Sequence, residues 1–311
     1  MYLYKGFSLV IASEIEFPEL VPITNTEEAI DLTVTIGTTP TALVGNGVVK
    51  KVSNWTSPTA FLLHIIDVAR YHLEGNKVTI EPLSSSADWS SIRTFFLGSM
   101  VSAALHYRGI LPIHASAVHY QDGLVLFCGL SGAGKSTTAT FLDKRGYPIF
   151  SDDTCVIRPE HVSAQQVLAQ ASYPMCRLWT DTLDTLAEPS YTKAHRVRDG
   201  IEKYGNYFHT SFDERALPIK HIYQLTTRNN PDIAKEEVTS KVQRINILSR
   251  HTFRRRQLDG IGTKAAHFKL LSQLSHLPIS NLYRPSSGTP ISSFIDFIEH
   301  ECLTGNTAKK A

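Results

Sequence analysis

A glycine-rich stretch at residues 129–137 has the residue types and the spacing needed to bind phosphate groups. It reads Gly-Leu-Ser-Gly-Ala-Gly-Lys-Ser-Thr and fits the pattern GxxxxGK[ST]. The glycines let the backbone turn tightly, so that several N–H groups point at one anion. In this pattern Lys135 neutralises the outer phosphates, and the hydroxyl of Ser136 ligates a magnesium ion. The stretch predicts a nucleoside triphosphate site made of Gly129, Leu130, Ser131, Gly132, Ala133, Gly134, Lys135, Ser136 and Thr137.

The segments on both sides of this loop have the patterns that the motif requires. Residues 124–128 form an apolar run typical of a strand buried on both faces. Residues 136–145 place Ala139 and Leu142 on one helical face, and Gly146 follows as a C-terminal stop. The order strand, loop, helix favours a phosphate site over the alternative, a Gly/Ser-rich turn that happens to contain a lysine.

His114 ends the apolar run 111–114, one hairpin before the strand that leads into the loop. Antiparallel pairing across a turn at residues 121–123 would place the far end of its strand, predicted over residues 113–120, near the phosphates. There His114 could contact the γ-phosphate or orient an acceptor hydroxyl. The alternative is a histidine that is merely hydrogen-bonded at the end of a strand.

Asp152 and Asp153 follow the strand after the loop helix, only 17 and 18 residues beyond Lys135. Sheets of α/β proteins bind ligands at this end of their strands. Two adjacent carboxylates beside a triphosphate could ligate magnesium and accept a proton from an attacking hydroxyl. The alternative is a solvated acidic turn.

This spacing resembles the catalytic core of the HPr kinase/phosphorylase family, a group of bacterial serine kinases that share a fold core with ATP-dependent phosphoenolpyruvate carboxykinase. The residues that carry the resemblance are 114–118, 129–136, 144–146 and 151–153, and the match covers roughly residues 110–157. The resemblance implies Lys135 at the phosphates, Ser136 at magnesium and Asp153 as the base that activates an acceptor serine. It implies His114 as a supporting residue and Asp152 at the metal or behind it.

The family's second signature, an acidic residue with an Arg-Gly-Leu-Gly-like loop, is absent, and residues 173–179 stand at the comparable distance. The chain is more similar to a divergent branch encoded with ribosomal peptide pathways. The chain resembles members of this branch at two places, Arg177-Leu178-Trp179 after the core and Arg108-Gly109 before the strand that contains His114. The branch implies a lasso-peptide precursor as substrate, phosphorylated on a serine at or near its C-terminus.

Three further cationic features have two interpretations each. Arg177 could bind a phosphate or a peptide carboxylate through its planar guanidinium, or form a surface ion pair. Lys203 could stabilise the transferred phosphoryl group or be a solvated loop lysine. The basic run 250–256 could receive an acidic peptide or nucleic acid, but the spacing of Ile245 and Leu248 favours the exposed side of an amphipathic helix.

Composition narrows the class of protein. A net charge of +2 gives no reason to expect a nucleic-acid or membrane partner. The four cysteines are scattered without a CxxC pair, and the N-terminus does not resemble a signal peptide. No apolar run reaches the length of a membrane span. These features predict a cytoplasmic protein with reduced thiols, and a homo-oligomer is compatible with them.

The predicted architecture is an α/β fold with an HPr kinase-like P-loop nucleotide core. A β-rich region covers residues 1–85, with strands at 7–12, 32–36 and 77–80. The kinase domain covers residues 86–311, beginning with a helix at 89–107 capped by Ser86 or Asp88 and ending in a helical part. The sequence thus predicts an ATP- and Mg²⁺-dependent serine kinase acting on a peptide or protein. The alternatives are a small-molecule hydroxyl kinase, a nucleotidyltransferase, or an inactive nucleotide-binding regulatory protein.

Overall fold

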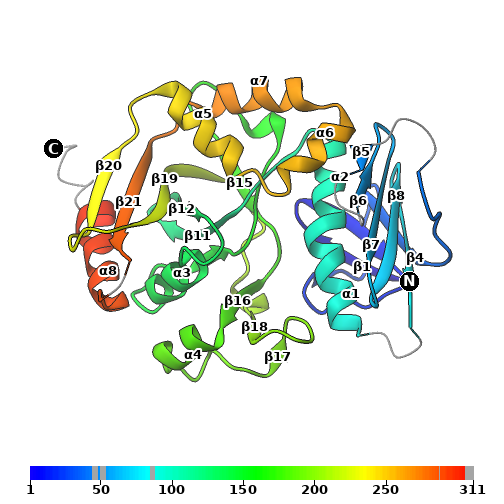
Figure 1. Cartoon of the computed structure of the whole chain (residues 1–311), viewed down its shortest axis with the longest axis horizontal. Helices are drawn as coiled ribbons and strands as arrows, with labels where there is room; N and C mark the ends of the chain where they lie inside the picture. Colours follow the sequence, from blue (N-terminus) through cyan, green and yellow to red (C-terminus); the bar gives the residue numbers. More distant parts are fainter. Residues whose placement is uncertain (44–47, 50–53, 85–87, 287, 305–311) are drawn as a thin grey trace.

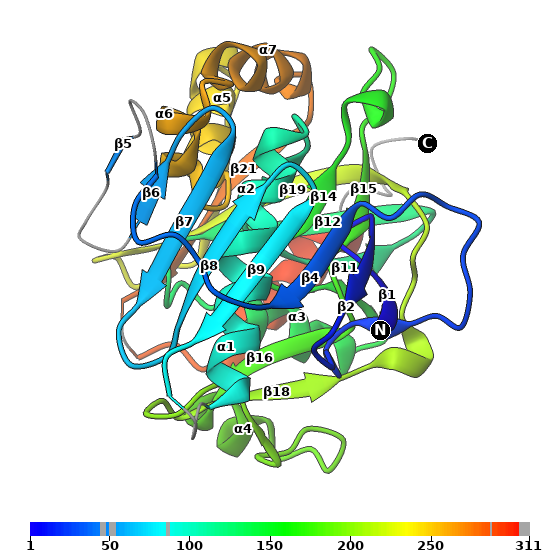
Figure 2. The same ribbon diagram turned by 90° about the vertical axis from the view of Figure 1, so that its right-hand side faces the viewer.

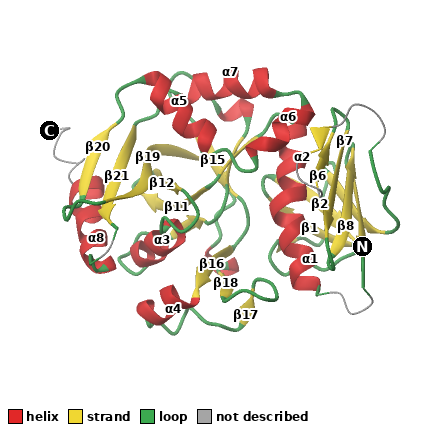
Figure 3. Ribbon diagram, viewed as in Figure 1, coloured by secondary structure: helices red, strands yellow, loops and turns green. Residues whose placement is uncertain are grey.

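The structure, a computed structural model, describes residues 1–43, 48–49, 54–84, 88–286 and 288–304. The fold is mixed α/β, with two large sheets, one small sheet and helices against both large sheets (Figures 1 and 3). Within the described residues, no helix has the length and apolar character needed to cross a membrane.

The N-terminal region forms the first large sheet. Its strands run in the order β3-β1-β2-β4-β9-β8-β7-β6-β5, and Figure 2 shows this sheet from its outer face. The pairs β2–β4 and β4–β9 are parallel, and the other pairs are antiparallel. The strands are Tyr2–Gly6 (β1), Leu9–Ser13 (β2), Val21–Pro22 (β3), Leu32–Ile36 (β4), Val48–Val49 (β5), Asn54–Thr56 (β6), Ala60–Ile65 (β7), Ala69–Glu74 (β8) and Lys77–Pro82 (β9).

The strands predicted at 7–12, 32–36 and 77–80 are present, with one shifted start. The strand predicted from residue 7 is β2, which begins at Leu9. Phe7 and Ser8 have positive φ values of 56° and 61° and make the turn after β1. Residues in that conformation cannot continue a pleated strand.

The helix predicted at 89–107 is present, and it covers the inner face of this sheet. It consists of α1 (Trp89–Phe95), a π-helical turn (Phe96–Met100) and α2 (Val101–Tyr107). Ile92, Phe96 and Met100 are fully buried against the strands. The Asp88 side chain caps α1 by accepting hydrogen bonds from two backbone N–H groups, whereas the alternative cap, Ser86, lies outside the described residues.

The second large sheet contains the strand that leads into the glycine-rich loop. Its order is β10-β14-β15-β19-β12-β11-β13, with β21 also paired to β19 and β20 paired to β21. The pairs β12–β19 and β19–β21 are parallel. The strands are Leu111–Ile113 (β10), Ala115–Tyr120 (β11), Gly123–Gly129 (β12), Ile149–Ser151 (β13), Cys155–Ile157 (β14), Leu168–Ala171 (β15), Leu217–Arg228 (β19), Ala234–Glu237 (β20) and Ile279–Pro285 (β21).

Strand β12 is buried on both faces, as the apolar run predicted. Leu124 and Leu126 pack in a cluster with α5 and α7, whereas Val125 and Phe127 pack in a cluster with α3 and α8. The core of the sheet is therefore covered by helices on both sides. These helices are Lys135–Asp143 (α3), Lys241–Arg250 (α5), Lys264–Leu274 (α7) and Ile291–Phe297 (α8), with the short α6 at Leu258–Ile261.

A small third sheet lies beside the end of α3. It has the order β16-β18-β17, formed by Met175–Trp179, Lys203–Tyr207 and His195–Arg196, and α4 (Thr180–Leu186) follows β16. Arg177 on β16 and Lys203 on β18 of this sheet line the same pocket as the glycine-rich loop.

Two elements differ from the sequence prediction. The strand expected over 113–120 is divided at His114, because β10 pairs with β14 whereas β11 pairs with β12 and β13. The C-terminal part contains β20 and β21 besides its helices. The domain boundary predicted at residues 85 and 86 falls on residues outside the described part, and it stays a prediction.

The cap of α1 is open to a direct test. Hydrogen bonds from Ser90, Ser91 and the Asp199 N–H outweigh the desolvation of Asp88 and lower its pKa to about 2. We expect Asp88→Ala to reduce the free energy of unfolding by about 1 kcal/mol in urea denaturation near neutral pH. Asp232→Ala, an exposed aspartate outside any helix, is the control. Because the pKa of Asp88 is lowered, the difference should shrink as the pH falls from about 4 toward 2. An unchanged stability would contradict the capping role.

Candidate active site

The glycine-rich stretch forms a tight turn between β12 and α3. Gly132 and Gly134 have φ values of 82° and 94°, a conformation that other residues rarely adopt. A Cβ atom at Gly129 would lie 2.9 Å from the carbonyl oxygen of Leu225 on the adjacent strand β19. The predicted order of strand, loop and helix is present, and the glycines stand where the backbone needs them.

The side chain of Lys135 lies inside the concave side of this loop. Its Nζ donates hydrogen bonds to the carbonyl oxygens of Gly129 at 3.0 Å and Leu130 at 3.3 Å. Only 7% of the residue is exposed, and this desolvation lowers its pKa, with Asp153 and Asp152 opposing the decrease. An ammonium group held only by carbonyl oxygens has room for a stronger, anionic partner.

His114 reaches the loop through the predicted hairpin. In the register of β11 and β12, Ala115 lies opposite Cys128, so His114 lies beside the start of the loop. Its Nδ1 donates a 2.7 Å hydrogen bond to the backbone carbonyl of Asp153 and lies 3.5 Å from Oδ1 of that residue. Desolvation lowers the pKa of His114, and Asp153 opposes the decrease. The imidazole is therefore neutral at pH 7, with Nδ1 carrying the proton.

Asp153 occupies the turn between β13 and β14 with a positive φ of 66°. Its Oδ2 lies 3.4 Å from a guanidinium nitrogen of Arg177. Burial raises the pKa of this carboxyl group, but the positive charges of Arg177, Lys203 and Lys135 outweigh burial and lower the pKa below its usual range. The side chain is an ionised carboxylate at neutral pH.

Asp152 points in a different direction. Its two carboxylate oxygens accept hydrogen bonds from the Ser116 hydroxyl at 2.5 Å and from the backbone N–H of Arg177 at 2.9 Å. Only 2% of the residue is exposed, and it does not line the pocket beside the loop. In this position Asp152 can hold Asp153 and Arg177 in place, but it does not face a ligand in the pocket.

These groups surround a pocket of about 740 Å³. Of the residues predicted for the site, it brings together Ser131 to Thr137 of the loop with His114, Asp153, Arg177 and Lys203. Gly129 and Leu130 lie in the loop but do not line the pocket. Six cationic side chains line it, namely Lys135, Arg177, Arg198, Lys203, Arg254 and Arg284. Such a concentration of positive charge matches a polyanionic ligand.

Three of these arginines were not predicted for the site. Arg198 precedes β18, Arg284 lies on β21, and Arg254 lies in the basic run 250–256. The interpretation of that run as a helix face is wrong beyond Arg250, where α5 ends, because Arg254 adopts a left-handed conformation with φ of 51°. The charge density of the run was the one signal that could have pointed to Arg254.

The arrangement fits a magnesium ion that arrives with a nucleotide. Among the described residues no three His, Cys, Asp or Glu side chains are grouped so that they could hold a metal. Mg²⁺ bound with substrate phosphates needs only one or two carboxylates from the protein. Ser136 and Asp153 line the same pocket and supply a hydroxyl and a carboxylate.

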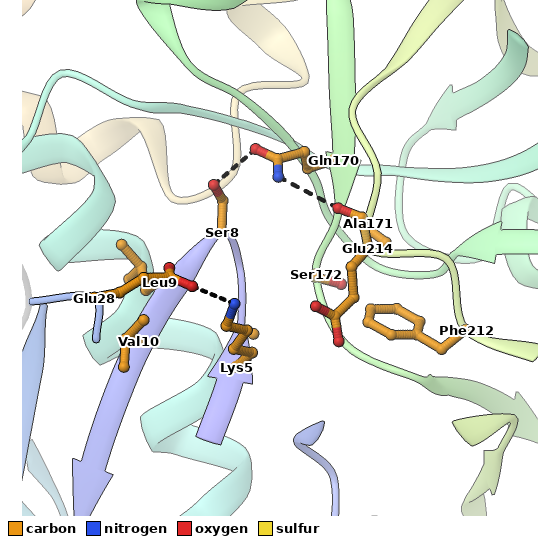
Figure 4. Close-up of a pocket in the computed structure, with 11 residues that line it drawn as sticks. Lys5, Ser8, Leu9, Val10, Glu28, Gln170, Ala171, Ser172, Phe212 and Glu214 are labelled. Carbon is orange, nitrogen blue, oxygen red and sulfur yellow. Dashed lines mark hydrogen bonds and ion pairs between the residues drawn. The ribbon is translucent and has the colours of Figure 1, made fainter. Parts of the chain in front are cut away.

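A second pocket of about 180 Å³ lies between β1–β2 and β15 (Figure 4). Its polar side chains already bond to one another: Lys5 pairs with Glu28 at 2.5 Å, and the Ser8 hydroxyl donates to Gln170 at 2.7 Å. Because its lysine is neutralised in this way, the pocket beside the loop is the stronger candidate.

Comparison with known proteins adds little to this geometry. No family model and no curated protein matches the chain. Among solved structures it is similar to the Hpr(Ser) kinase/phosphatase from Coxiella burnetii, with a TM-score of 0.31 and 11% identity over 64% of this chain and 94% of that chain. A likeness this weak is not evidence for the fold or the chemistry.

The contact between His114 and Asp153 predicts that the pKa of His114 changes when Asp153 is replaced. Asp153 raises the pKa of His114 against the effect of desolvation, so Asp153→Asn should lower that pKa further. NMR titration of the imidazole signals, assigned with His114→Gln, measures this change. His119, whose pKa depends on desolvation and Asp213, is the internal control and should not move. A rise in the pKa of His114 would contradict the arrangement.

Proposed function

We propose that this chain is an ATP- and Mg²⁺-dependent kinase that transfers the γ-phosphoryl group to a serine hydroxyl of a peptide or protein. One observation carries the proposal. The ionised carboxylate of Asp153, 3.5 Å from His114 and 3.4 Å from Arg177, lines the same pocket as the glycine-rich loop and Lys135. A protein that only bound nucleotides would need the loop but not a carboxylate held in this way.

The loop provides the nucleotide end of the pocket. Its N–H groups and the N-terminus of α3 favour phosphate, and Lys135 exchanges its carbonyl partners for phosphate oxygens. A Cβ atom at Gly134 would lie 3.9 Å from a guanidinium nitrogen of Arg284, so this arginine lies over the loop. Ile291 and Phe294 line the pocket as apolar surface for the nucleoside. ATP is the donor we propose because it is the usual one.

The carboxylate of Asp153 provides the base. The serine hydroxyl gives its proton to Asp153, a bond forms between the hydroxyl oxygen and the γ-phosphorus, and the bond from that phosphorus to the β-phosphate oxygen breaks. His114 holds the Asp153 backbone through its 2.7 Å hydrogen bond. Bound between Ser136 and Asp153, Mg²⁺ would neutralise charge on the β- and γ-phosphates.

Arg177 and Lys203 stabilise the negative charge that spreads over the transferred group. The side chain of Arg177 is almost fully buried, and its Nε has no hydrogen-bond partner among the described residues. Its guanidinium group lines the pocket beside Asp153, where it can donate hydrogen bonds to phosphoryl oxygens. Lys203 lies over the ring of Trp179 at 5.6 Å and lines the same wall. The resemblance to the ribosomal-peptide branch makes a serine at the C-terminus of a lasso-peptide precursor the acceptor that we propose.

Replacement of the base should separate chemistry from binding. We expect Asp153→Asn to reduce phosphate transfer by about a hundredfold or more, the scale of general base catalysis. Affinity for ATP without magnesium should stay unchanged or become tighter, because a negative charge leaves a phosphate pocket. Asp184→Asn, on α4 in a surface ion pair with Lys193, is the matched control and should leave both properties unchanged. Normal transfer by Asp153→Asn would rule out the base assignment.

Loss of the loop lysine should affect both ATP binding and phosphate transfer. We expect Lys135→Ala to weaken ATP binding, measured with a fluorescent ATP analogue, and to lower the rate of transfer. Mass spectrometry of incubated serine peptides distinguishes the reactions, because a kinase adds one phosphoryl group whereas a nucleotidyltransferase adds a nucleotide. Unchanged binding by Lys135→Ala would contradict the phosphate-loop assignment.

A further inference from the structure

The wall of the pocket beyond Asp153 has features that phosphate binding does not explain. It is formed by Thr94, Phe95 and Gly98 of the first helical segment, by Arg198, and by the turn that contains Arg254. In Figure 1, α1 lies on one side of α3 and α8 on the other. The nucleoside end near α8 and this wall near α1 are therefore opposite ends of one pocket.

Arg254 is fixed in an unfavourable backbone conformation. Its φ of 51° is left-handed, which is uncommon for a residue other than glycine, asparagine or aspartate. The preceding residue, Phe253, is anchored on both sides: its N–H donates to the Pro112 carbonyl at 2.8 Å, and its carbonyl accepts from His106 Nε2 at 2.9 Å. Local strain held by strong contacts is typical of functional positions.

The opposing helix makes room for this arginine. Gly98 lies in the π-helical turn between α1 and α2, and the nearest atom to a Cβ at this position would be a guanidinium nitrogen of Arg254, at 3.9 Å. π-Helical turns occur frequently at functional sites. A larger side chain at Gly98 would extend into the space in front of the guanidinium.

The guanidinium of Arg254 has no ion-pair partner within the described part of the chain. It lies at the pocket and near the ring of Phe253, which in turn lies 5.3 Å from the ring of His114. His114 touches Asp153, and Arg254 lines the same pocket as this base, at which an acceptor hydroxyl must arrive. Arg198 lies on the same wall, over the ring of Phe95 at 5.8 Å.

We propose that Arg254, assisted by Arg198, binds a carboxylate carried by the acceptor and so selects acidic acceptors. This inference rests on the proposed function and specifies its substrate class. A guanidinium binds a carboxylate through two parallel hydrogen bonds, which would also fix the acceptor hydroxyl relative to Asp153. The carboxylate could be the C-terminus of a peptide or an acidic side chain beside the serine.

The test uses three N-acetylated serine peptides of one neutral sequence. The first ends in a free acid at the serine, the second in an amide, and the third in an amide with an aspartate next to the serine. Phosphate transfer is measured by mass spectrometry, and binding by calorimetry with a non-hydrolysable ATP analogue. The wild-type chain should prefer one or both acidic peptides over the neutral amide by about tenfold to a hundredfold in kcat/KM, the scale of a hydrogen bond to a charged group.

The variant Arg254→Asn should lose this preference, so that its kcat/KM for the acidic peptides falls to the value for the neutral amide. Asparagine tolerates the left-handed conformation, so the variant should fold at least as stably as the wild type. Arg254→Lys should retain part of the preference, because it keeps the charge but not the planar fork. Arg256→Gln, exposed in the same basic run but outside the pocket, is the matched control.

The outcomes separate this inference from the proposed function. Equal transfer to all three peptides, or a preference that survives in Arg254→Asn, overturns the carboxylate site but leaves the kinase. If no peptide is phosphorylated, the peptide-kinase proposal fails and calorimetry decides the inference. In that case the carboxylate site is supported if the wild-type chain binds an acidic peptide more strongly than the neutral amide and Arg254→Asn abolishes this difference. It is overturned if no peptide at millimolar concentration shows binding that depends on Arg254.

Discussion

The buried carboxylate of Asp152 is the interaction on which the geometry of the site depends. One oxygen accepts from the Ser116 hydroxyl on β11 and the other from the backbone N–H of Arg177 on β16. Asp152 itself lies in the turn between β13 and β14, so one side chain joins three elements. A buried charge that loses its hydrogen bonds costs several kcal/mol, so these elements are held in a single arrangement.

This anchoring allows two adjacent aspartates to take different roles. The positive φ of Asp153 directs its carboxylate away from that of Asp152 and toward the loop. There it meets Arg177 and His114, and the positive charges of Arg177, Lys203 and Lys135 favour the ionised form against the effect of burial. The same residue type is thus structural in one position and available to a ligand in the next, because the surroundings differ.

The first sheet contributes to the site through its covering helix. The Thr94 hydroxyl on α1 donates to the Val197 carbonyl at 2.7 Å, and Asp88 accepts from the Asp199 N–H at 3.3 Å. These contacts tie the loop that carries Arg198 to α1. The helical segment that covers the first sheet therefore forms one wall of the pocket, whereas the second sheet supplies the glycine-rich loop.

The sequence by itself determined the features that depend on neighbouring residues. The glycine spacing of residues 129–134, the doubly buried strand before them and the capped helix at 89–107 all follow from short-range rules of turn geometry and apolar periodicity. The hairpin register that brings His114 to the loop also follows from a local turn. The roles of these residues in catalysis remain predictions.

Only the tertiary structure decided which distant cations join the pocket and which carboxylate faces it. Arg198, Arg254 and Arg284 come from three segments far apart in the sequence, and no local pattern links them to the loop. Asp152 and Asp153 are indistinguishable by residue type. Asp152 contacts Ser116 and the Arg177 backbone, whereas Asp153 contacts the Arg177 guanidinium, and these contacts exist only after the strands have packed. Long-range pairing of this kind depends on the whole fold rather than on a window of sequence, which is the physical reason why these three arginines could not be predicted for the pocket.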